Sequence, residues 1–364
     1  MWSRLLKIKG KIYGIVYSQR GVAFKSGTLK LSSGHSMPTI GLGTAKLDDE
    51  ETIRKCLTTA LDTGYRLFDT AYVYQSEKLI GKVLKDVLDI ANLEREELFF
   101  TSKLPFNALH PDVVEHFCRL SLASLNTSYL DLYLIHCPVA TKHTGNDNEI
   151  ISFENGCAVT EHINLTDTWK AMESLVGKGL VKSIGLSNFN SKQIQRIYDA
   201  ANIKPAALQV ECHAYLPQYE LVDFCKKLDI TVTASSPLGT PDFPKFVREV
   251  LGIKDFNRPT LLEDDRLKSL AEKYSKTPAQ ILLRYLVQRG IAVISKSSHP
   301  ERIQQNIDIF NFTLMDDDMK ELKSIASGVR YIPFDFWKGM FCSFSASKNT
   351  PNIHFMRPSK VFRW

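Results

Sequence analysis

The strongest constraint on the fold is a regular alternation between short apolar runs and amphipathic segments, repeated from residue 39 to residue 308. The apolar runs are typical of buried strands, and the segments between them have the length and capping residues of helices. We predict strands at residues 39–44, 65–68, 97–103, 130–136, 181–186, 206–210, 230–234 and 291–294. We predict helices at residues 49–63, 76–90, 111–125, 167–177, 191–201, 217–228, 264–275, 278–290, 299–308 and 316–327.

Eight strands separated by helices predict an α/β fold of the (β/α)8 TIM-barrel type. An open, doubly wound sheet is the alternative, but no Gly-x-Gly-x-x-Gly motif opens any of the predicted helices. Residues 28–38 predict an N-terminal β-hairpin with its turn at Ser33 and Gly34. We therefore predict a barrel domain over residues 28–330. We expect three segments near the barrel mouth. They are a C-terminal tail at 331–364, a long connection at 138–165, and a loop of more than 20 residues that follows the strand at 230–234 and ends at about 261.

The positive charge of the chain is concentrated at its N-terminus. Residues 1–30 contain seven Lys or Arg and no acid, so the rest of the chain has a net charge of −1 within a total of +6. Such a body lacks the basic surface of a nucleic-acid-binding protein, and no apolar run approaches the ~20 residues of a membrane span. We predict that residues 1–27 are a basic extension, either disordered or a mitochondrial targeting segment, on an otherwise cytoplasmic protein.

The seven cysteines are scattered and include no Cys-x-x-Cys pair. This pattern favours reduced thiols over a disulfide framework or a zinc site, and we predict no metal.

Polar side chains follow several predicted strands at the point where each strand ends. Asp69, Lys103 and His136 end three successive strands, and Tyr74 lies on the loop after Asp69. Each residue alone has an ordinary structural interpretation: a solvent-facing acid, a packing tyrosine, a lysine whose stem is buried or a hydrogen-bonded core histidine. Because the carboxyl ends of all barrel strands meet at one mouth, we expect the four side chains to converge there.

These four side chains predict proton transfer to an oxygen that gains negative charge. We expect Lys103 to lower the pKa of Tyr74 from about 10, which makes the phenol a better general acid. Asp69 would keep Lys103 charged, and His136 would orient a substrate carbonyl. No side chain in the set can donate a hydride, so the pattern implies a nicotinamide cofactor.

The chain resembles the aldo-keto reductase superfamily, close to the aldose reductase and aldehyde reductase branch. The resemblance covers residues 29–325 and rests on five motifs: Gly64-Tyr65-Arg66-x-x-Asp69-Thr70-Ala71-x-x-Tyr74, Leu130-Asp131-Leu132-Tyr133-Leu134-Ile135-His136-x-Pro138, Gly185-Leu186-Ser187-Asn188-Phe189, Gln209-Val210-Glu211-Cys212-His213 and Ile294-Ser295-Lys296-Ser297. It implies reduction of an aldehyde or ketone with NADPH, with Asp69, Tyr74, Lys103 and His136 as the catalytic tetrad.

The resemblance also implies the residues of the two binding sites. The NADPH/NADP+ site would comprise Thr44, Asp69, Ser187, Asn188, Gln209, Ser236, Leu238, Thr240, Asp242, Lys296, Ser297, Arg302 and Asn306. Lys296 and Arg302 suit a 2′-phosphate, which favours NADPH over NADH. A small-molecule carbonyl substrate would contact Ala45, Tyr72, Tyr74, His136 and Cys137.

The sequence departs from the family pattern around these sites. Ser235 stands where relatives carry an aromatic residue under the nicotinamide, and Ala45, Pro105 and Cys137 stand where aldose reductases carry tryptophans. We therefore expect weaker cofactor binding and a roomier mouth, unless aromatic residues of the tail replace the missing rings. We expect a monomer. The alternative function is a cofactor-binding regulatory or structural protein with little turnover.

Overall fold

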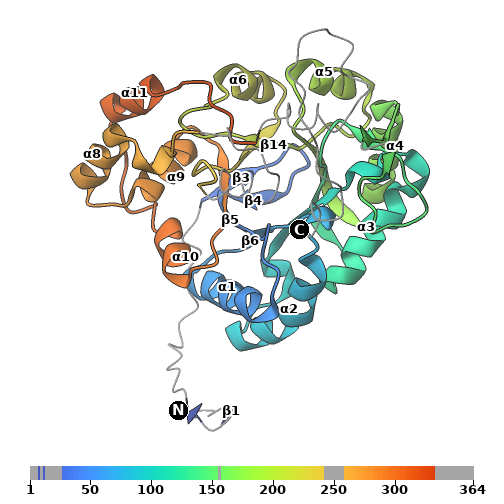
Figure 1. Ribbon diagram of the computed structural model, residues 1–364, viewed down its shortest axis with the longest axis horizontal. Coiled ribbons are helices and arrows are strands. Elements are labelled where there is room, and N and C mark those ends of the chain that lie inside the picture. Colours follow the sequence, from blue (N-terminus) through green and yellow to red (C-terminus); the bar gives the residue numbers. More distant parts are fainter. Residues whose placement is uncertain (1–6, 9–10, 13–26, 155–156, 242–257, 333–364) are drawn as a thin grey trace.

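The predicted strands form a closed parallel barrel in the computed structural model, which describes residues 7–8, 11–12, 27–154, 157–241 and 258–332 (Figure 1). The barrel strands are β5 (Ile40–Gly43), β6 (Leu67–Asp69), β7 (Phe99–Leu104), β8 (Leu130–Ile135), β13 (Val181–Ser187), β14 (Ala207–Glu211), β15 (Thr231–Ser235) and β16 (Ala292–Ser295). β16 pairs in parallel with β5, with Val293 opposite Ile40, and this pairing closes the barrel. The predicted (β/α)8 fold is confirmed.

Helices surround the barrel, as Figure 1 shows. They are α1 (Glu50–Thr63), α2 (Glu77–Ala91), α3 (Pro111–Leu125), α4 (Leu165–Gly177), α5 (Ser191–Ala200), α6 (Tyr219–Lys227), α8 (Asp265–Tyr274), α9 (Pro278–Gln288), α10 (Pro300–Ile307) and α11 (Asp316–Ser324). Single 3-10 turns lie at η1 (Tyr72–Tyr74), η2 (Arg95–Glu97), η3 (Phe106–Ala108) and η4 (Leu261–Glu263). All ten predicted helices are present, with ends that differ by up to three residues.

Local sequence signals explain where the first helix begins and ends. The Asp49 carboxylate accepts a hydrogen bond from the Thr52 amide (2.8 Å), which satisfies one free N–H group of the first turn of α1. Gly64 ends the helix at φ 103°, a left-handed conformation that glycine adopts without steric cost. The chain then turns directly into β6, which carries Asp69.

The predicted N-terminal hairpin is present as β3 (Thr28–Lys30) and β4 (Ser36–Pro38). Its side chains Leu31 and Met37 are buried in one cluster with residues from the beginnings of the barrel strands, among them Leu67 and Ala292. The hairpin therefore covers the amino-terminal end of the barrel, and the opposite end remains for the functional site.

The long connection after β8 contains two small antiparallel pairs. β9 (Ala140–Thr141) pairs with β12 (Thr160–Glu161), and β10 (Phe153–Glu154) pairs with β11 (Cys157–Ala158). A further short pair, β1 (Lys7–Ile8) with β2 (Lys11–Ile12), lies near the N-terminus. None of the helices in the described ranges is long and apolar enough to cross a membrane.

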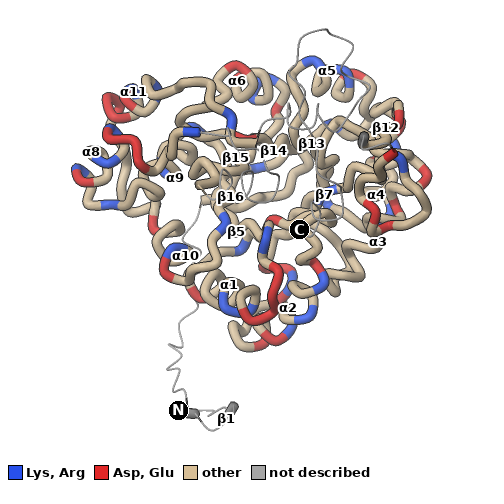
Figure 2. The backbone as a smooth tube through the Cα atoms, viewed as in Figure 1, with Lys and Arg blue, Asp and Glu red and all other residues tan. Residues whose placement is uncertain are grey.

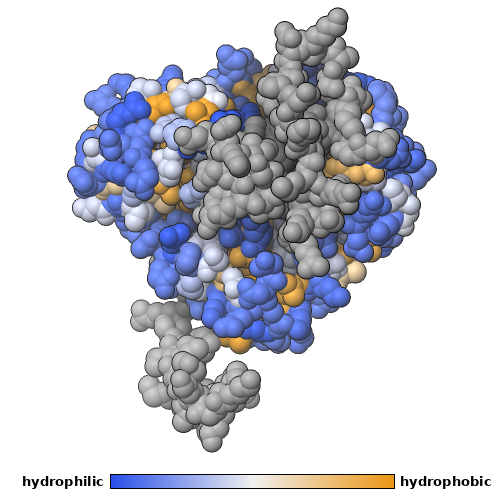
Figure 3. All heavy atoms as spheres, viewed as in Figure 1, coloured by the Kyte–Doolittle hydropathy of each residue, from blue (hydrophilic) through white to orange (hydrophobic). Residues whose placement is uncertain are grey.

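The core lies between the barrel and the outer helices, where large side chains such as Trp169, Phe117 and Tyr285 are buried. Figure 2 shows Lys and Arg intermixed with Asp and Glu along the outer helices. The described surface in Figure 3 is mainly hydrophilic over these helices, with scattered hydrophobic residues. In this view, charge of one sign is not concentrated over any one group of helices.

Candidate active site

A cavity of about 1510 Å³ opens at the carboxyl ends of the barrel strands. Its lining includes Asp69, Tyr74 and His136, and also the cations Lys296 and Arg302. Because the hairpin covers the opposite end of the barrel, this mouth is where the predicted functional side chains meet.

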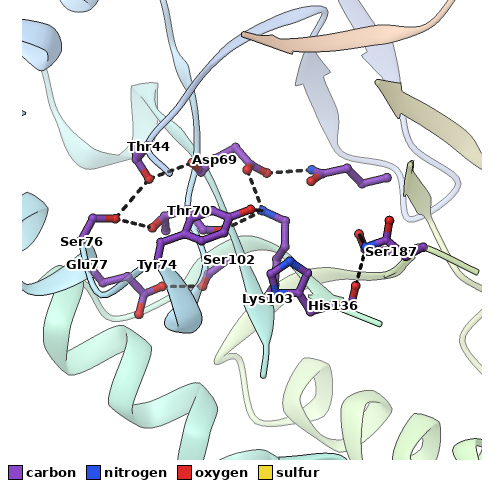
Figure 4. A network of polar contacts seen from close by, with 12 residues as sticks. Thr44, Asp69, Thr70, Tyr74, Ser76, Glu77, Ser102, Lys103, His136 and Ser187 are labelled. Atoms are coloured by element: carbon purple, nitrogen blue, oxygen red, sulfur yellow. Dashed lines mark hydrogen bonds and ion pairs between the residues drawn. The ribbon is translucent and has the colours of Figure 1, made fainter. Parts of the chain in front are cut away.

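Three barrel strands and one 3-10 turn bring the predicted tetrad together (Figure 4). Lys103, in β7, lies with its Nζ 2.6 Å from Oδ1 of Asp69, the last residue of β6. The same nitrogen lies 3.5 Å from the Tyr74 hydroxyl oxygen. The ring of His136, directly after β8, stands edge-to-face on the Tyr74 ring with centroids 5.8 Å apart. The predicted convergence is therefore present in the structure.

The charge of Lys103 is fixed by its neighbours. Burial alone would lower the pKa of Lys103, but the charge of Asp69 raises it above its ordinary value. The ammonium also donates to the Thr70 carbonyl oxygen at 2.8 Å. Lys103 is thus a buried cation aimed at the phenol of Tyr74.

The charge of Lys103 lowers the pKa of Tyr74, as expected, but burial of the ring has the larger and opposite effect. Burial raises the pKa of Tyr74 above its usual value, and the charge of Lys103 offsets only part of that rise. The desolvation of a phenolate in this cavity outweighs one neighbouring cation. Tyr74 is therefore a protonated phenol near neutral pH, with the Lys103 cation beside its hydroxyl.

His136 is held as a neutral imidazole. Burial, followed by repulsion from Lys103, lowers the pKa of His136 well below 6.5. A neutral imidazole can donate a hydrogen bond from one nitrogen and accept one at the other. The Phe106 ring lies against it, with centroids 5.4 Å apart.

Hydrogen bonds from the surrounding strands fix Asp69. Gln209, in β14, donates from Nε2 to Oδ2 of Asp69 at 2.7 Å, and the Thr44 hydroxyl donates to the Asp69 carbonyl oxygen at 3.0 Å. Gln209 was predicted to hold a nicotinamide carboxamide. In the structure the amide nitrogen of Gln209 donates to Asp69, and the amide oxygen of Gln209 takes no part in this hydrogen bond.

The other two residues predicted for the carboxamide lie beside His136. Asn188 donates from Nδ2 to the His136 carbonyl oxygen (2.8 Å) and to the Ser187 hydroxyl oxygen (3.1 Å). Asn188 has a left-handed backbone with φ 64° at the end of β13. Both residues line the cavity close to the tetrad.

Most of the residues predicted for the rest of the cofactor line the same cavity. They are Thr44, Ser236, Leu238, Thr240, Lys296, Ser297, Arg302 and Asn306, and Asp242 lies outside the described residues. The hydroxyl oxygen of Thr240 is buried with no hydrogen-bond partner in the described part of the chain. Neither Lys296 nor Arg302 forms an ion pair with a described acidic residue.

These features fit a dinucleotide. The cavity is large and extends from the tetrad to the two cations. The Thr240 hydroxyl and the cations Lys296 and Arg302, which have no hydrogen-bonded or acidic partner among the residues described, suit phosphate oxygens. Ser187, Asn188 and the amide oxygen of Gln209 suit the carboxamide.

The lining of the cavity differs in part from the predicted set of substrate-contacting residues. Ala45, Tyr74, His136 and Cys137 line it as expected, but Tyr72 does not, and Val73 does. Further apolar lining residues not predicted from the sequence are Phe106, Ile150, Ile151 and Phe153. They lie in the connections after β7 and β8. The only feature of the sequence that could have indicated them is that these two loops follow strands that end on polar residues.

Comparison with known proteins agrees with this geometry. The model of the aldo/keto reductase family matches residues 39–327. The barrel and the site define an oxidoreductase of this class, and the chain belongs to the aldo/keto reductase family.

Individual relatives cover most of the chain. It is 45% identical over 307 residues to aldo-keto reductase family 1 member A1-A of Danio rerio, across 84% of this chain and 91% of that protein. It is 45% identical over 303 residues to aldo-keto reductase family 1 member A1 of Homo sapiens, across 83% and 90% of the two chains. The solved aldose reductase of Schistosoma japonicum superposes with a TM-score of 0.77 at 40% identity, covering 86% of this chain and 96% of that one.

Proposed function

We propose that this enzyme reduces aldehydes or ketones to alcohols with NADPH, and that Tyr74 is the proton donor. The observation that carries the proposal is the contact of one buried cation, Lys103, with both Asp69 and Tyr74 in a cavity that Lys296 and Arg302 also line. NADPH, when bound, supplies the hydride.

The side chains of the site have separate roles in this reaction. Neutral His136 hydrogen-bonds the substrate carbonyl oxygen and orients it toward the Tyr74 hydroxyl. Tyr74 gives its proton to that oxygen as negative charge develops there. Lys103 stabilises the resulting phenolate, and Asp69 holds Lys103 in place.

The lining of the cavity supports the binding roles that we propose. Ser187, Asn188 and the amide oxygen of Gln209 would hold the carboxamide, while Thr44, Ser236, Leu238 and Thr240 would lie along the pyrophosphate. Ser297 and Asn306 would lie near the adenosine, and Lys296 and Arg302 would bind its 2′-phosphate. Ala45, Val73, Phe106 and Cys137 would contact an apolar part of the substrate.

The proposal is tested by following NADPH oxidation with a panel of aldehydes for wild type and Tyr74→Phe, together with NADPH binding by fluorescence. We expect turnover by wild type, and a loss of at least about 100-fold in Tyr74→Phe with NADPH affinity retained. If wild type binds NADPH without oxidising it for any aldehyde, the protein is a cofactor-binding regulatory or structural protein.

We further propose that the protein acts in the cytoplasm as a monomer and that residues 1–27 are an extension outside the barrel domain. Fractionation of cells that produce the full chain tests the location, since an organelle signal would place the protein in mitochondria. Sedimentation of the purified chain tests the oligomeric state.

A further inference from the structure

One wall of the cavity is formed by the segment between β9 and β10. This segment contributes Asn148, Glu149, Ile150 and Ile151 to the lining. Asp147 directly precedes these four residues but does not line the cavity itself. Its side chain lies on the other side of the segment, against helix α3.

Asp147 is bound there by two histidines. His116 of α3 places Nε2 2.9 Å from Oδ2 of Asp147, and His143 of the segment places Nε2 3.2 Å from Oδ1. We call these three residues the Asp147 clamp. Hydrogen bonds from His116, and then from His143, hold the pKa of the Asp147 carboxyl below its ordinary value despite partial burial. Asp147 is therefore ionised near neutral pH.

Aromatic contacts keep the two histidines in position. The buried ring of Phe117 packs edge-to-face on His116 (5.5 Å between centroids, 85°) and on His143 (5.6 Å, 83°). Phe117 also packs edge-to-face on Tyr72, with centroids 5.1 Å apart. Rings of three chain segments thus meet on one core residue.

Tyr72 connects the clamp to the tetrad. Its hydroxyl donates to the Asp147 carbonyl oxygen at 3.3 Å, and Tyr72 and Tyr74 belong to the same 3-10 turn, η1. The side chain that was predicted to contact substrate therefore contacts the cavity wall from behind. The wall and the proton donor are fixed by neighbouring residues of one turn.

We propose that Asp147 is a positioning residue for substrate: through His116, His143 and Tyr72 it fixes the wall formed by residues 148–151 relative to Tyr74. The inference rests on the proposed function, because it treats this side of the cavity as the substrate side. It is a role for side chains, and not a metal site, since no group of three or more His, Cys, Asp or Glu in the described ranges is arranged to hold a metal ion.

The size of the effect follows from exposure. The side chains of His116 and Asp147 are 51% and 31% exposed, so water screens their pairing. Pairs of this kind contribute modestly, and loss of the clamp should raise the KM for an aldehyde by about two- to fivefold. The chemistry at Tyr74 and the NADPH site lie beyond its direct contacts.

The test compares Asp147→Asn and Asp147→Ala with wild type, by steady-state kinetics with an aldehyde that wild type reduces. We expect KM to rise in the order wild type, Asn, Ala, with kcat and the Kd for NADPH unchanged. Asp112→Asn is the matched control, because it also removes a carboxylate that lies beside a histidine. Oδ2 of Asp112 lies 3.6 Å from Nδ1 of His110 at the exposed start of α3, the helix that carries His116. It should leave KM as in wild type.

A double-mutant cycle of Asp147→Asn with His116→Gln separates positioning from general destabilisation. The two changes should raise KM less than additively, because either one breaks the clamp. The inference is overturned if Asp147→Asn lowers Tm without changing KM, or if kcat and the Kd for NADPH change together with KM.

Hydrogen exchange gives a readout that does not need turnover. Asp147→Asn should speed exchange of the Asn148 and Glu149 amides, which donate to Asn146 in the intact segment. If wild type binds NADPH without turnover, the proposed function fails. The exchange of these two amides then tests, without kinetics, whether the Asp147 clamp fixes residues 148–151. Unchanged exchange then overturns it.

Discussion

The ammonium of Lys103 lies 2.6 Å from Oδ1 of Asp69, and the two side chains are 0% and 5% exposed. Removing one member of such a pair leaves a buried charge without its partner. We expect Lys103→Met to lower the free energy of unfolding by about 3 kcal/mol, measured by urea unfolding at pH 7.5. Activity should fall as well, because the phenolate of Tyr74 loses its stabilising cation.

The control for this prediction is the double variant Asp69→Asn/Lys103→Met. An asparagine can still accept the hydrogen bond from Gln209, and no unpaired charge remains. We expect at least half of the lost stability to return while activity stays absent. A double variant as unstable as Lys103→Met would show that the cost comes from packing and not from the orphaned carboxylate.

Ser235 lines the cavity at the end of β15 and is half-buried. An aromatic ring at this position would offer a flat apolar surface to a bound nicotinamide. We expect Ser235→Tyr to tighten NADPH binding about fivefold, which corresponds to about 1 kcal/mol of ring stacking. Fluorescence titration measures the Kd for NADPH, with Ser174→Tyr on the exposed face of α4 as the control. Equal affinities in the three proteins would refute a missing platform.

Arg302, on α10, is exposed, lines the cavity and has no acidic partner in the described ranges. We expect Arg302→Ala to weaken NADPH binding about tenfold or more and NADH binding little, since only NADPH carries the 2′-phosphate. The difference should shrink at high salt. Arg119→Ala on α3 controls for removal of an exposed cation. An equal loss for both cofactors would contradict a phosphate-binding role.

The lowered pKa of His136 predicts a loss of stability in mild acid. Below about pH 6.5 the imidazole takes up a proton in the unfolded chain but not in the folded one. More protons bound by the unfolded state means that stability rises with pH, by up to about 1.4 kcal/mol per pH unit for one group. We expect wild type to lose stability from pH 6.5 to 5.5, and His136→Gln to lose less over the same interval. Parallel urea unfolding curves for the two proteins at each pH would contradict this assignment.

The barrel and the convergence of the tetrad could be predicted because both depend on periodicity. Apolar runs with polar ends gave the strands, and the geometry of a parallel barrel then required Asp69, Lys103 and His136 to share one mouth. No contact distance was needed for that conclusion.

Details that depend on rotation and burial could not be predicted in the same way. Tyr72 was expected in the cavity, but successive side chains of the 3-10 turn point about 120° apart, so Val73 faces the cavity and Tyr72 faces Phe117. The rise in the pKa of Tyr74 depends on how completely the ring is desolvated, which a single sequence does not specify. The Asp147 clamp joins residues of a helix and a long loop that share no motif.

The hydrogen bond from Gln209 to Asp69 joins two residues 140 positions apart in the chain. These residues belong to β14 and β6, which are not neighbours in the barrel. Neither half of the barrel can make this bond alone. During refolding, the helical signal can therefore recover before the site exists, whereas catalytic activity can return only once the ring of strands is complete. Regain of activity would thus time the slow, long-range step of folding.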